Sequence, residues 1–284
     1  MILVSGAAGK TGRAVIEALV ERNTAVRAFV QRKEQAMSAL ALGAAEAVVG
    51  DMQNEVDVRK AMAGVTAVYH ICPNMHPEET GIGELAVRAA QQNSVSRFVY
   101  HSVLHPQVEA MPHHWQKMRV EEQLFISGLA FTILQPAAYM QNLRGSWDTI
   151  VEEGVYRVPY PPSTWLNMVD LRDVAEAAAV VLTTPGHEYA TYELAGPENL
   201  SQTEIAALLQ TRLNHSVSVR RISPAAWTAQ ARAAGLGQYQ IETLLKMFAY
   251  YGRYNFPGNP QTLTWLLGRP PGTLADFLRR SLAP

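Results

Sequence analysis

Short apolar runs alternate with amphipathic segments along the first half of the chain. The run at residues 2–5 leads into a segment whose apolar residues, from Val15 to Val20, fall on one helical face. The same alternation predicts strands at residues 24–30, 46–49, 65–71, 97–102 and 131–134, and helices at residues 34–42, 54–64, 83–92 and 112–127. Asn54 is expected to cap the second of these helices. Such strict alternation is typical of right-handed βαβ crossovers. The expected fold is therefore α/β, with a doubly wound parallel sheet of the Rossmann type.

The helix expected at residues 112–127 is amphipathic, and we place Val120, Leu124 and Phe125 on its buried face. The second half of the chain is less regular. It predicts strands at residues 165–169 and 192–194, and helices at residues 171–182 and 238–251. Two more helices are expected where Ser201 and Glu204 form a capping box, and where Ser223 precedes a proline at the first helical position.

The chain of 284 residues is long enough for one large domain or two small ones. We expect residues 1–135 to form a dinucleotide-binding unit, with residues 165–184 returning to it. Residues 136–164 and 185–284 would form a small α/β lobe that covers the substrate. In sheets of this kind ligands bind at the carboxyl ends of the strands, so we expect the lobe there.

A glycine motif directly follows the first strand, with Gly6, Gly9 and Gly12 at three-residue spacing. A strand, a glycine turn and an amphipathic helix in this order are typical of a pyrophosphate site, in which the helix N-terminus supplies N–H groups and positive potential. We expect the cofactor to contact the loop at residues Gly6, Ala8, Gly9, Lys10, Thr11 and Gly12.

Composition narrows the class of protein. Apolar residues make up 48% and charged residues 17%, and the formal net charge is −1 without a basic run. These values argue against a nucleic acid or an anionic membrane as a partner. The single cysteine, Cys72, excludes an internal disulfide and is expected to be a small buried side chain. With no membrane-spanning run and no basic leader, we expect a cytoplasmic protein.

The end of the second strand indicates which nicotinamide cofactor binds. NAD-selective sites usually have a carboxylate there, whereas this chain has Gln31, Arg32 and Lys33. Arg32 offers a planar fork to a 2′-phosphate and Lys33 adds a point charge, so we favour NADP(H) over NAD(H). The alternative is a solvated basic helix start, which would oppose the helix dipole.

Several short motifs together resemble the NmrA-like group of atypical short-chain dehydrogenases and reductases over essentially the whole chain. They are Gly6/Gly9/Gly12, Gln31-Arg32-Lys33, Gly50-Asp51, Tyr100-His-Ser102, Lys117-x-x-x-Glu121, Thr132 to Pro136, Tyr139 to Asn142, and Val169-Asp170-x-x-Asp173. The family includes NADPH-dependent quinone and dye reductases, related aromatic-compound reductases, and regulators that bind the cofactor without known turnover. The resemblance implies further cofactor contacts at residues Asp51, Met52, Ile71, Cys72, Pro73, Lys117 and Pro136.

The candidate catalytic residues follow the fifth strand. Many short-chain dehydrogenases use a Tyr-x-x-x-Lys pair on one helical face together with a serine at that strand end. This chain keeps Ser102 and Lys117 but has His113 at the tyrosine position. Lys117 would hold the ribose and tune another donor such as His113, or act as the acid itself, as resemblance to the aromatic reductases implies. In a third reading the site binds the cofactor without turnover.

Tyr139 and Asn142 are expected in the floor of the substrate cleft, with Trp165 in an aromatic wall, although each could equally be packing. The first functional hypothesis is an NADPH-dependent reductase of a small electrophile such as a quinone, enone or aromatic carbonyl. The second is a non-catalytic NADP(H)-binding redox sensor with a regulatory protein partner. Sugar-nucleotide epimerisation is disfavoured because it relies on the missing tyrosine. A homodimer is compatible with either hypothesis.

Overall fold

Seven strands form the main sheet in the order β3-β2-β1-β4-β5-β6-β10, and the computed structural model describes residues 1–282. The strands are β1 (Ile2–Val4), β2 (Val26–Val30), β3 (Glu46–Val49), β4 (Ala67–His70), β5 (Arg97–His101), β6 (Phe131–Pro136) and β10 (Ala190–Leu194). The pairs from β3 across to β6 are parallel. The order reverses at β1, which is the switch point of a doubly wound sheet. The expected fold class is confirmed.

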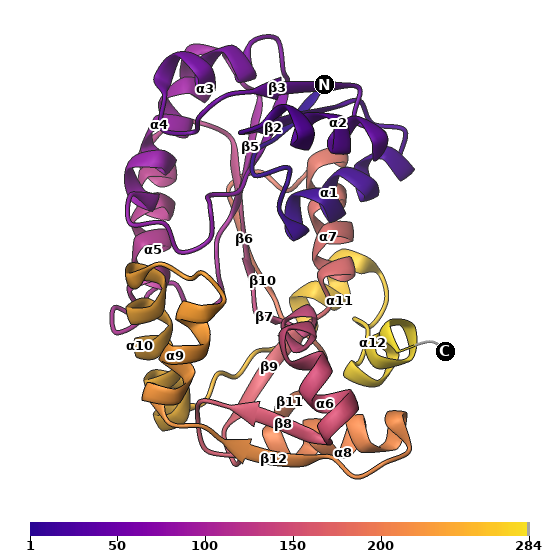
Figure 1. Cartoon of the computed structure of the whole chain (residues 1–284). Coiled ribbons are helices and arrows are strands. Elements are labelled where there is room, and N and C mark those ends of the chain that lie inside the picture. The colour runs from indigo at the N-terminus through magenta and orange to yellow at the C-terminus, as the bar shows by residue number, and fades with distance from the viewer. Residues whose placement is uncertain (283–284) are drawn as a thin grey trace. The chain divides into compact units, whose positions relative to one another are not determined.

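Helices cover both faces of this sheet (Figure 1). On one face lie α1 (Lys10–Glu21), α2 (Lys33–Ala41) and α7 (Leu171–Thr183). On the other lie α3 (Glu55–Met62), α4 (Glu79–Gln92) and α5 (Pro112–Ile126). Asn54 caps α3 as expected, because its side-chain oxygen accepts hydrogen bonds from the N–H groups of Val56 and Asp57.

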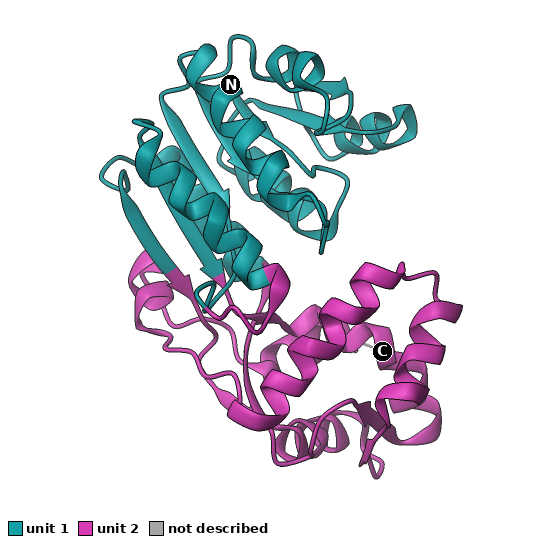
Figure 2. Ribbon diagram, turned by 90° about the vertical axis from the view of Figure 1, so that its left-hand side faces the viewer, with its two compact units in different colours: residues 1–107, 114–135, 172–192 teal, residues 108–113, 136–171, 193–284 magenta. Residues whose placement is uncertain are grey.

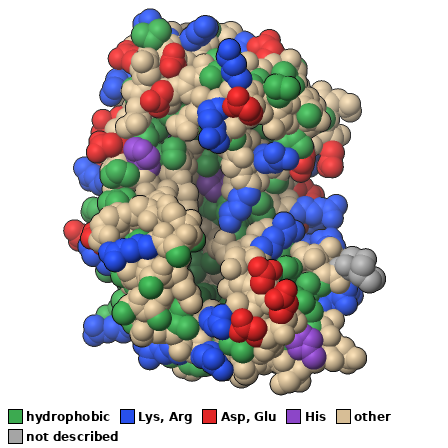
Figure 3. Space-filling view, viewed as in Figure 1, with side chains coloured by type: hydrophobic (Ala, Val, Ile, Leu, Met, Phe, Trp, Pro, Cys, Tyr) green, Lys and Arg blue, Asp and Glu red, His purple; other side chains and the backbone are tan. Residues whose placement is uncertain are grey.

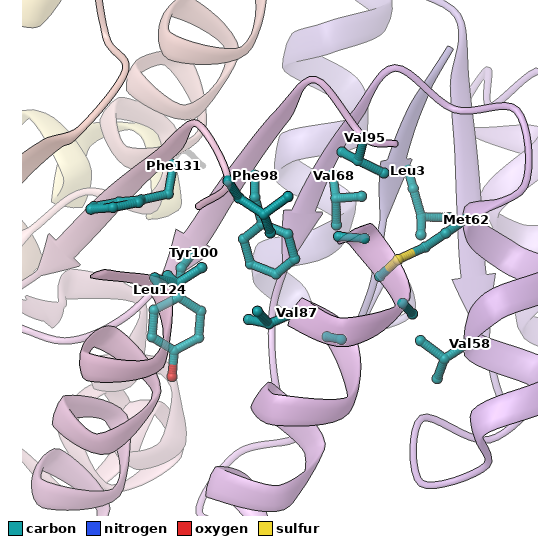
Figure 4. Packing of buried hydrophobic residues seen from close by; sticks show 14 of the residues in the cluster. Leu3, Val58, Met62, Val68, Val87, Val95, Phe98, Tyr100, Leu124 and Phe131 are labelled. Carbon is teal, nitrogen blue, oxygen red and sulfur yellow. The ribbon is translucent and has the colours of Figure 1, made fainter. Parts of the chain in front are cut away.

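One buried cluster joins the second face of the sheet to its helices (Figure 4). Leu3, Val68 and Phe98 reach it from the strands, and Met62 and Leu124 reach it from α3 and α5. Fully burying side chains of this size contributes about 1.5–3 kcal/mol each. The cluster therefore fixes α3, α4 and α5 against this face of the sheet.

Two expectations about these helices are wrong. Phe125 is 61% exposed rather than buried, because the buried face of α5 carries Val120 and Leu124 and turns Phe125 outward. Helix α4 begins at Glu79, four residues earlier than expected. Glycines at 81 and 83 have low helix propensity, so the sequence does not predict a helix there. Close packing against α5 nevertheless requires glycine at position 83. A Cβ there would lie 2.5 Å from Val120.

Two compact units divide the chain (Figure 2). Unit 1 comprises residues 1–107, 114–135 and 172–192, and unit 2 comprises residues 108–113, 136–171 and 193–284. We expected residues 165–184 to return to the N-terminal unit, but residues 165–171 lie in unit 2. The reason is that β9 (Trp165–Val169) pairs with β7 (Ala138–Tyr139) and β11 (Asn199–Ser201).

Unit 2 also contains a two-stranded sheet of β8 (Val155–Val158) and β12 (Ser218–Arg221). Its helices are η1 (Met140–Ser146), α6 (Trp147–Glu153), α8 (Gln202–Leu213), α9 (Pro224–Ala233), α10 (Gln238–Tyr254), α11 (Gln261–Leu267) and α12 (Leu274–Ser281). Both caps expected here are confirmed: Ser201 and Glu204 form a capping box on α8, and Ser223 caps α9.

A buried carboxylate holds the last helix of unit 2. Asp170 accepts hydrogen bonds from Gln141 and from Arg280 of α12, which is also its ion-pair partner. Asp170 therefore has a structural role.

Within residues 1–282, no helix combines the length and the apolar character that crossing a bilayer requires. Acidic and basic side chains are interspersed over the N-terminal elements at the top of Figure 3.

We predict that Gly12→Ala lowers the free energy of unfolding by about 1–3 kcal/mol, because overpacking against rigid backbone costs that much. A Cβ at Gly12 would lie 2.4 Å from the carbonyl oxygen of Gly6. Gly81→Ala is the matched control, since Gly81 also lies in a helix but has no atom within 4 Å of the added carbon. The control should stabilise the protein slightly through helix propensity. Urea unfolding of both variants provides the comparison, and equal stabilities would contradict the prediction.

Candidate functional site

The glycine loop joins β1 to α1 and has the backbone geometry of a phosphate cradle. Gly6 has a φ of +58°, and a Cβ on it would lie 3.0 Å from the carbonyl oxygen of Ile71. Gly9 is the N-cap of α1, so no side chain covers the first turn, and that turn has no acidic residue. A Cβ on Gly9 would approach only the Gly6 carbonyl, at 3.3 Å. The loop and the helix N-terminus therefore suit an anion.

Next to this loop is a pocket of about 220 Å³. Ala7 and Ala8 of the loop line it together with Arg13 of α1, and Arg32 and Gln35 line it from the N-terminal end of α2. The side-chain oxygen of Gln35 accepts hydrogen bonds from the backbone N–H groups of Gln31 and Arg32, at 3.1 and 3.0 Å, which holds this turn. Within residues 1–282 neither guanidinium forms an ion pair.

Sequence reasoning anticipated only part of this pocket. Arg32 lines it as expected, whereas Lys33 is not among the lining residues. Arg13 was missed. Its signal was its position directly after the third glycine, on the first turn of α1, where a basic side chain opposes the helix dipole and needs an anionic partner.

The other expected cofactor residues lie at the ends of the strands. Asp51 follows β3, and its side chain accepts a hydrogen bond from the N–H of Gln53, while Met52 is buried in the core cluster. Ile71 follows β4 and is packed against Gly6, with Cys72 and Pro73 after it. Burial raises the pKa of the Cys72 thiol, so it stays protonated, as expected of a small buried side chain. Pro136 ends β6 and is buried.

Lys117 extends from α5 into a buried ion pair at the end of β5. Its Nζ lies 2.5 Å from Oε1 of Glu79, in the first turn of α4, and donates at 3.1 Å to the carbonyl oxygen of His101. The Lys117 side chain is 14% exposed and that of Glu79 is 1% exposed. Sequence reasoning missed Glu79, which no motif marked.

Ser102 is 2% exposed, and its hydroxyl donates a hydrogen bond to the carboxylate of Glu121. The amide nitrogen of Gln135 donates to both Glu121 oxygens, each at 3.0 Å. Burial raises the pKa of Glu121, and the hydrogen bonds from Ser102 and Gln135 oppose that rise. The contacts from Ser102 and Gln135 partly offset the effect of burial on this carboxylate and hold the Ser102 hydroxyl in place.

The two histidines at the start of α5 are both buried. His113 is 7% exposed and His114 is fully buried. Nδ1 of His114 lies 3.2 Å from the carbonyl oxygen of His105, and burial lowers the pKa of His114 to about 3. His114 is therefore a neutral buried side chain.

The expected substrate residues belong to unit 2. Tyr139 is half-buried in β7, Asn142 is exposed in η1, and Trp165 is 39% exposed at the start of β9. The backbone N–H of Trp165 donates to the Asn255 side chain, which follows α10. Ser102, Lys117 and the glycine loop all belong to unit 1.

A sequence model described as the NmrA-like family matches residues 1–270. The chain belongs to the NmrA-like family. It is 28% identical to an NAD(P)H azoreductase of Xenophilus azovorans, over all of this chain and 98% of the relative. It is also 28% identical to quinone oxidoreductase 2 of Escherichia coli, over 97% of this chain and 96% of the relative. A crystal structure of the NADPH-dependent quinone oxidoreductase from E. coli, complexed with NADPH, superposes with a TM-score of 0.88 at 26% identity, covering 99% of both chains.

We predict that the free energy of unfolding falls as the pH is lowered from 6.5 towards 3. Burial lowers the pKa of His70, His101 and His114 from 6.5 to about 3, so between these values the unfolded chain binds protons that the folded chain does not. Each such histidine adds a slope of up to about 1.4 kcal/mol per pH unit. Urea unfolding at several pH values measures it. His70→Gln should flatten the slope, whereas His215→Gln, at an exposed position, should leave it unchanged.

Proposed function

We propose that this chain is an NADPH-dependent oxidoreductase that reduces a small, flat electrophile such as a quinone, an enone or an aromatic carbonyl compound. The named relatives confirm the expectation of an oxidoreductase with a nicotinamide cofactor. Their substrates, an azo compound and a quinone by name, support the proposed class without fixing the compound. The observation that carries the proposal is the pairing of an anion cradle with a buried lysine in unit 1.

The residues of unit 1 fit NADPH. The glycine loop and the N-terminus of α1 suit the pyrophosphate, since Gly9 places no side chain over the first turn and the helix dipole favours anions. Gly12 lets α1 pack closely on the backbone of the loop. Arg13 and Arg32 line one pocket and together suit a 2′-phosphate, which a guanidinium can bind through two parallel hydrogen bonds. NADPH, when bound, supplies the hydride.

Lys117 is the residue we propose to act on the substrate. Two-electron reduction of a carbonyl or quinone adds a hydride and a proton, and negative charge develops on oxygen before the proton arrives. An ammonium group stabilises that charge. Ser102 and His113 are less suited, because the Ser102 hydroxyl already donates to Glu121 and the His113 side chain is buried.

We predict that Arg13→Gln and Arg32→Gln each weaken NADPH binding about tenfold or more, because each removes a charge-assisted phosphate contact. NADH binding should change little. Isothermal titration calorimetry with both cofactors measures the difference. Lys33→Gln is the matched control, since Lys33 adjoins Arg32 in sequence but does not line the pocket. Equal losses for NADH and NADPH would refute the phosphate assignment.

We predict that Lys117→Met lowers turnover about 100-fold, the scale of a positioned electrostatic group, while NADPH still binds. The methionine keeps most of the stem and removes the charge. NADPH consumption is followed with a panel of quinones, enones and dyes. Lys60→Met, at an exposed lysine, is the control and should retain full turnover.

Two outcomes of this assay count against the proposal. A folded Lys117→Met protein with wild-type turnover would remove Lys117 from the reaction. A wild-type protein that binds NADPH tightly but reduces none of the compounds would favour the redox sensor instead.

A cytoplasmic location, a homodimer and a regulatory partner remain predictions from the sequence.

A further inference from the structure

Glu79 is a buried acid in a place where its helix does not require one. It lies in the first turn of α4, where a carboxylate is favoured by the helix dipole, but an exposed side chain would serve that purpose equally well. Instead its side chain is 1% exposed. Removing a carboxylate from water is costly unless a positive group and hydrogen bonds compensate, so its partners must account for its position.

The main partner of Glu79 is the Lys117 ammonium group, which also contacts the His101 carbonyl and the Tyr100 ring. Oε1 of Glu79 lies 2.5 Å from Nζ of Lys117 and accepts a hydrogen bond from the Tyr100 hydroxyl at 3.4 Å. The ammonium also donates to the His101 carbonyl oxygen, and it lies 5.4 Å from the centre of the Tyr100 ring, within range of a cation–π interaction. The Tyr100 ring is itself packed in the core cluster, so this arrangement is rigid (Figure 4).

The count of donors shows what this arrangement leaves for a ligand. An ammonium group has three N–H donors. Within residues 1–282, Lys117 uses one on Glu79 and one on the His101 carbonyl, so the third has no hydrogen-bond acceptor among the described residues.

The positive charge of Lys117 affects the pKa of three buried side chains around it. The Lys117 charge contributes, after burial, to lowering the pKa of His70 and His101 to about 3. It also opposes the rise in the pKa of Glu121. The histidines therefore stay neutral, and Lys117 remains the positive group at the end of β5.

We propose that Glu79 is a positioning residue that keeps Lys117 as a fixed ammonium ion with one N–H donor available to the substrate oxygen. This inference rests on the proposed role of Lys117 and narrows it. Held beside the Glu79 carboxylate, Lys117 stabilises developing negative charge by a hydrogen bond. The proton that completes the reduction then comes from solvent.

The test is Glu79→Gln, which keeps a hydrogen-bond acceptor but removes the negative charge. Without the carboxylate, the amine is no longer held in the ion pair and reacts more readily with an acylating reagent. The rate at which acetyl N-hydroxysuccinimide ester labels Lys117 at pH 8, read by peptide mass spectrometry, should therefore rise about tenfold. Turnover should fall about tenfold, with the KM for NADPH unchanged because the arginine pocket is intact.

Two further variants separate positioning from general damage. Glu79→Asp retains the charge and should keep slow labelling and partial turnover, and it replaces Glu79→Gln as the test should that variant not fold. Glu188→Gln removes the partner of Arg97, another ion pair of unit 1, and should change neither readout.

The outcomes distinguish this inference from the proposed function. Unchanged labelling of Lys117 in folded Glu79→Gln, or fast labelling in Glu79→Asp, overturns the positioning role while leaving the oxidoreductase proposal intact. Faster labelling with wild-type turnover shows that Lys117 takes no part in reduction, which overturns both its catalytic role and the inference built on it.

Discussion

A buried ion pair between Glu79 and Lys117 constrains the end of β5 in unit 1. It joins three elements, because the carboxylate comes from the start of α4, the ammonium from α5, and the accepting carbonyl from the last residue of β5. Removing one member of such a buried pair costs about 3–5 kcal/mol, since the other charge is left without compensation. The same contact therefore fixes two things: where α4, α5 and the end of β5 lie relative to one another, and where the positive charge of Lys117 lies.

Elements that depend on local signals could be predicted from the sequence. The bounds of β3 and β9 were predicted to the residue, and the caps at Asn54, Ser201 and Ser223 were recognised because each cap acts on its own helix. Elements that depend on distant packing could not. Gly83 reads as a helix breaker until Val120 of α5 is seen to occupy the space of its missing side chain.

In the candidate site, too, the residues with local sequence signals could be predicted and those that depend on distant contacts could not. The glycine loop is one continuous segment whose spacing predicts its geometry, and Arg32 lies two residues after the end of the second strand. Arg13 follows the loop but gains its meaning only from the pocket that it shares with α2. Glu79 lies 38 residues before Lys117 and is brought to it by the sheet, so nothing in its local sequence could have marked it.

The division of unit 1 into three separate stretches of chain affects how the protein is made. Strand β10 is the neighbour of β6 in the sheet, yet residues 136–171 of unit 2 are synthesised between them. A ribosome-bound chain that has completed β6 thus carries a sheet with an unpaired edge, which can pair with other chains until β10 emerges. Sheet completion comes late in translation, and unit 1 cannot be obtained as a single excised fragment.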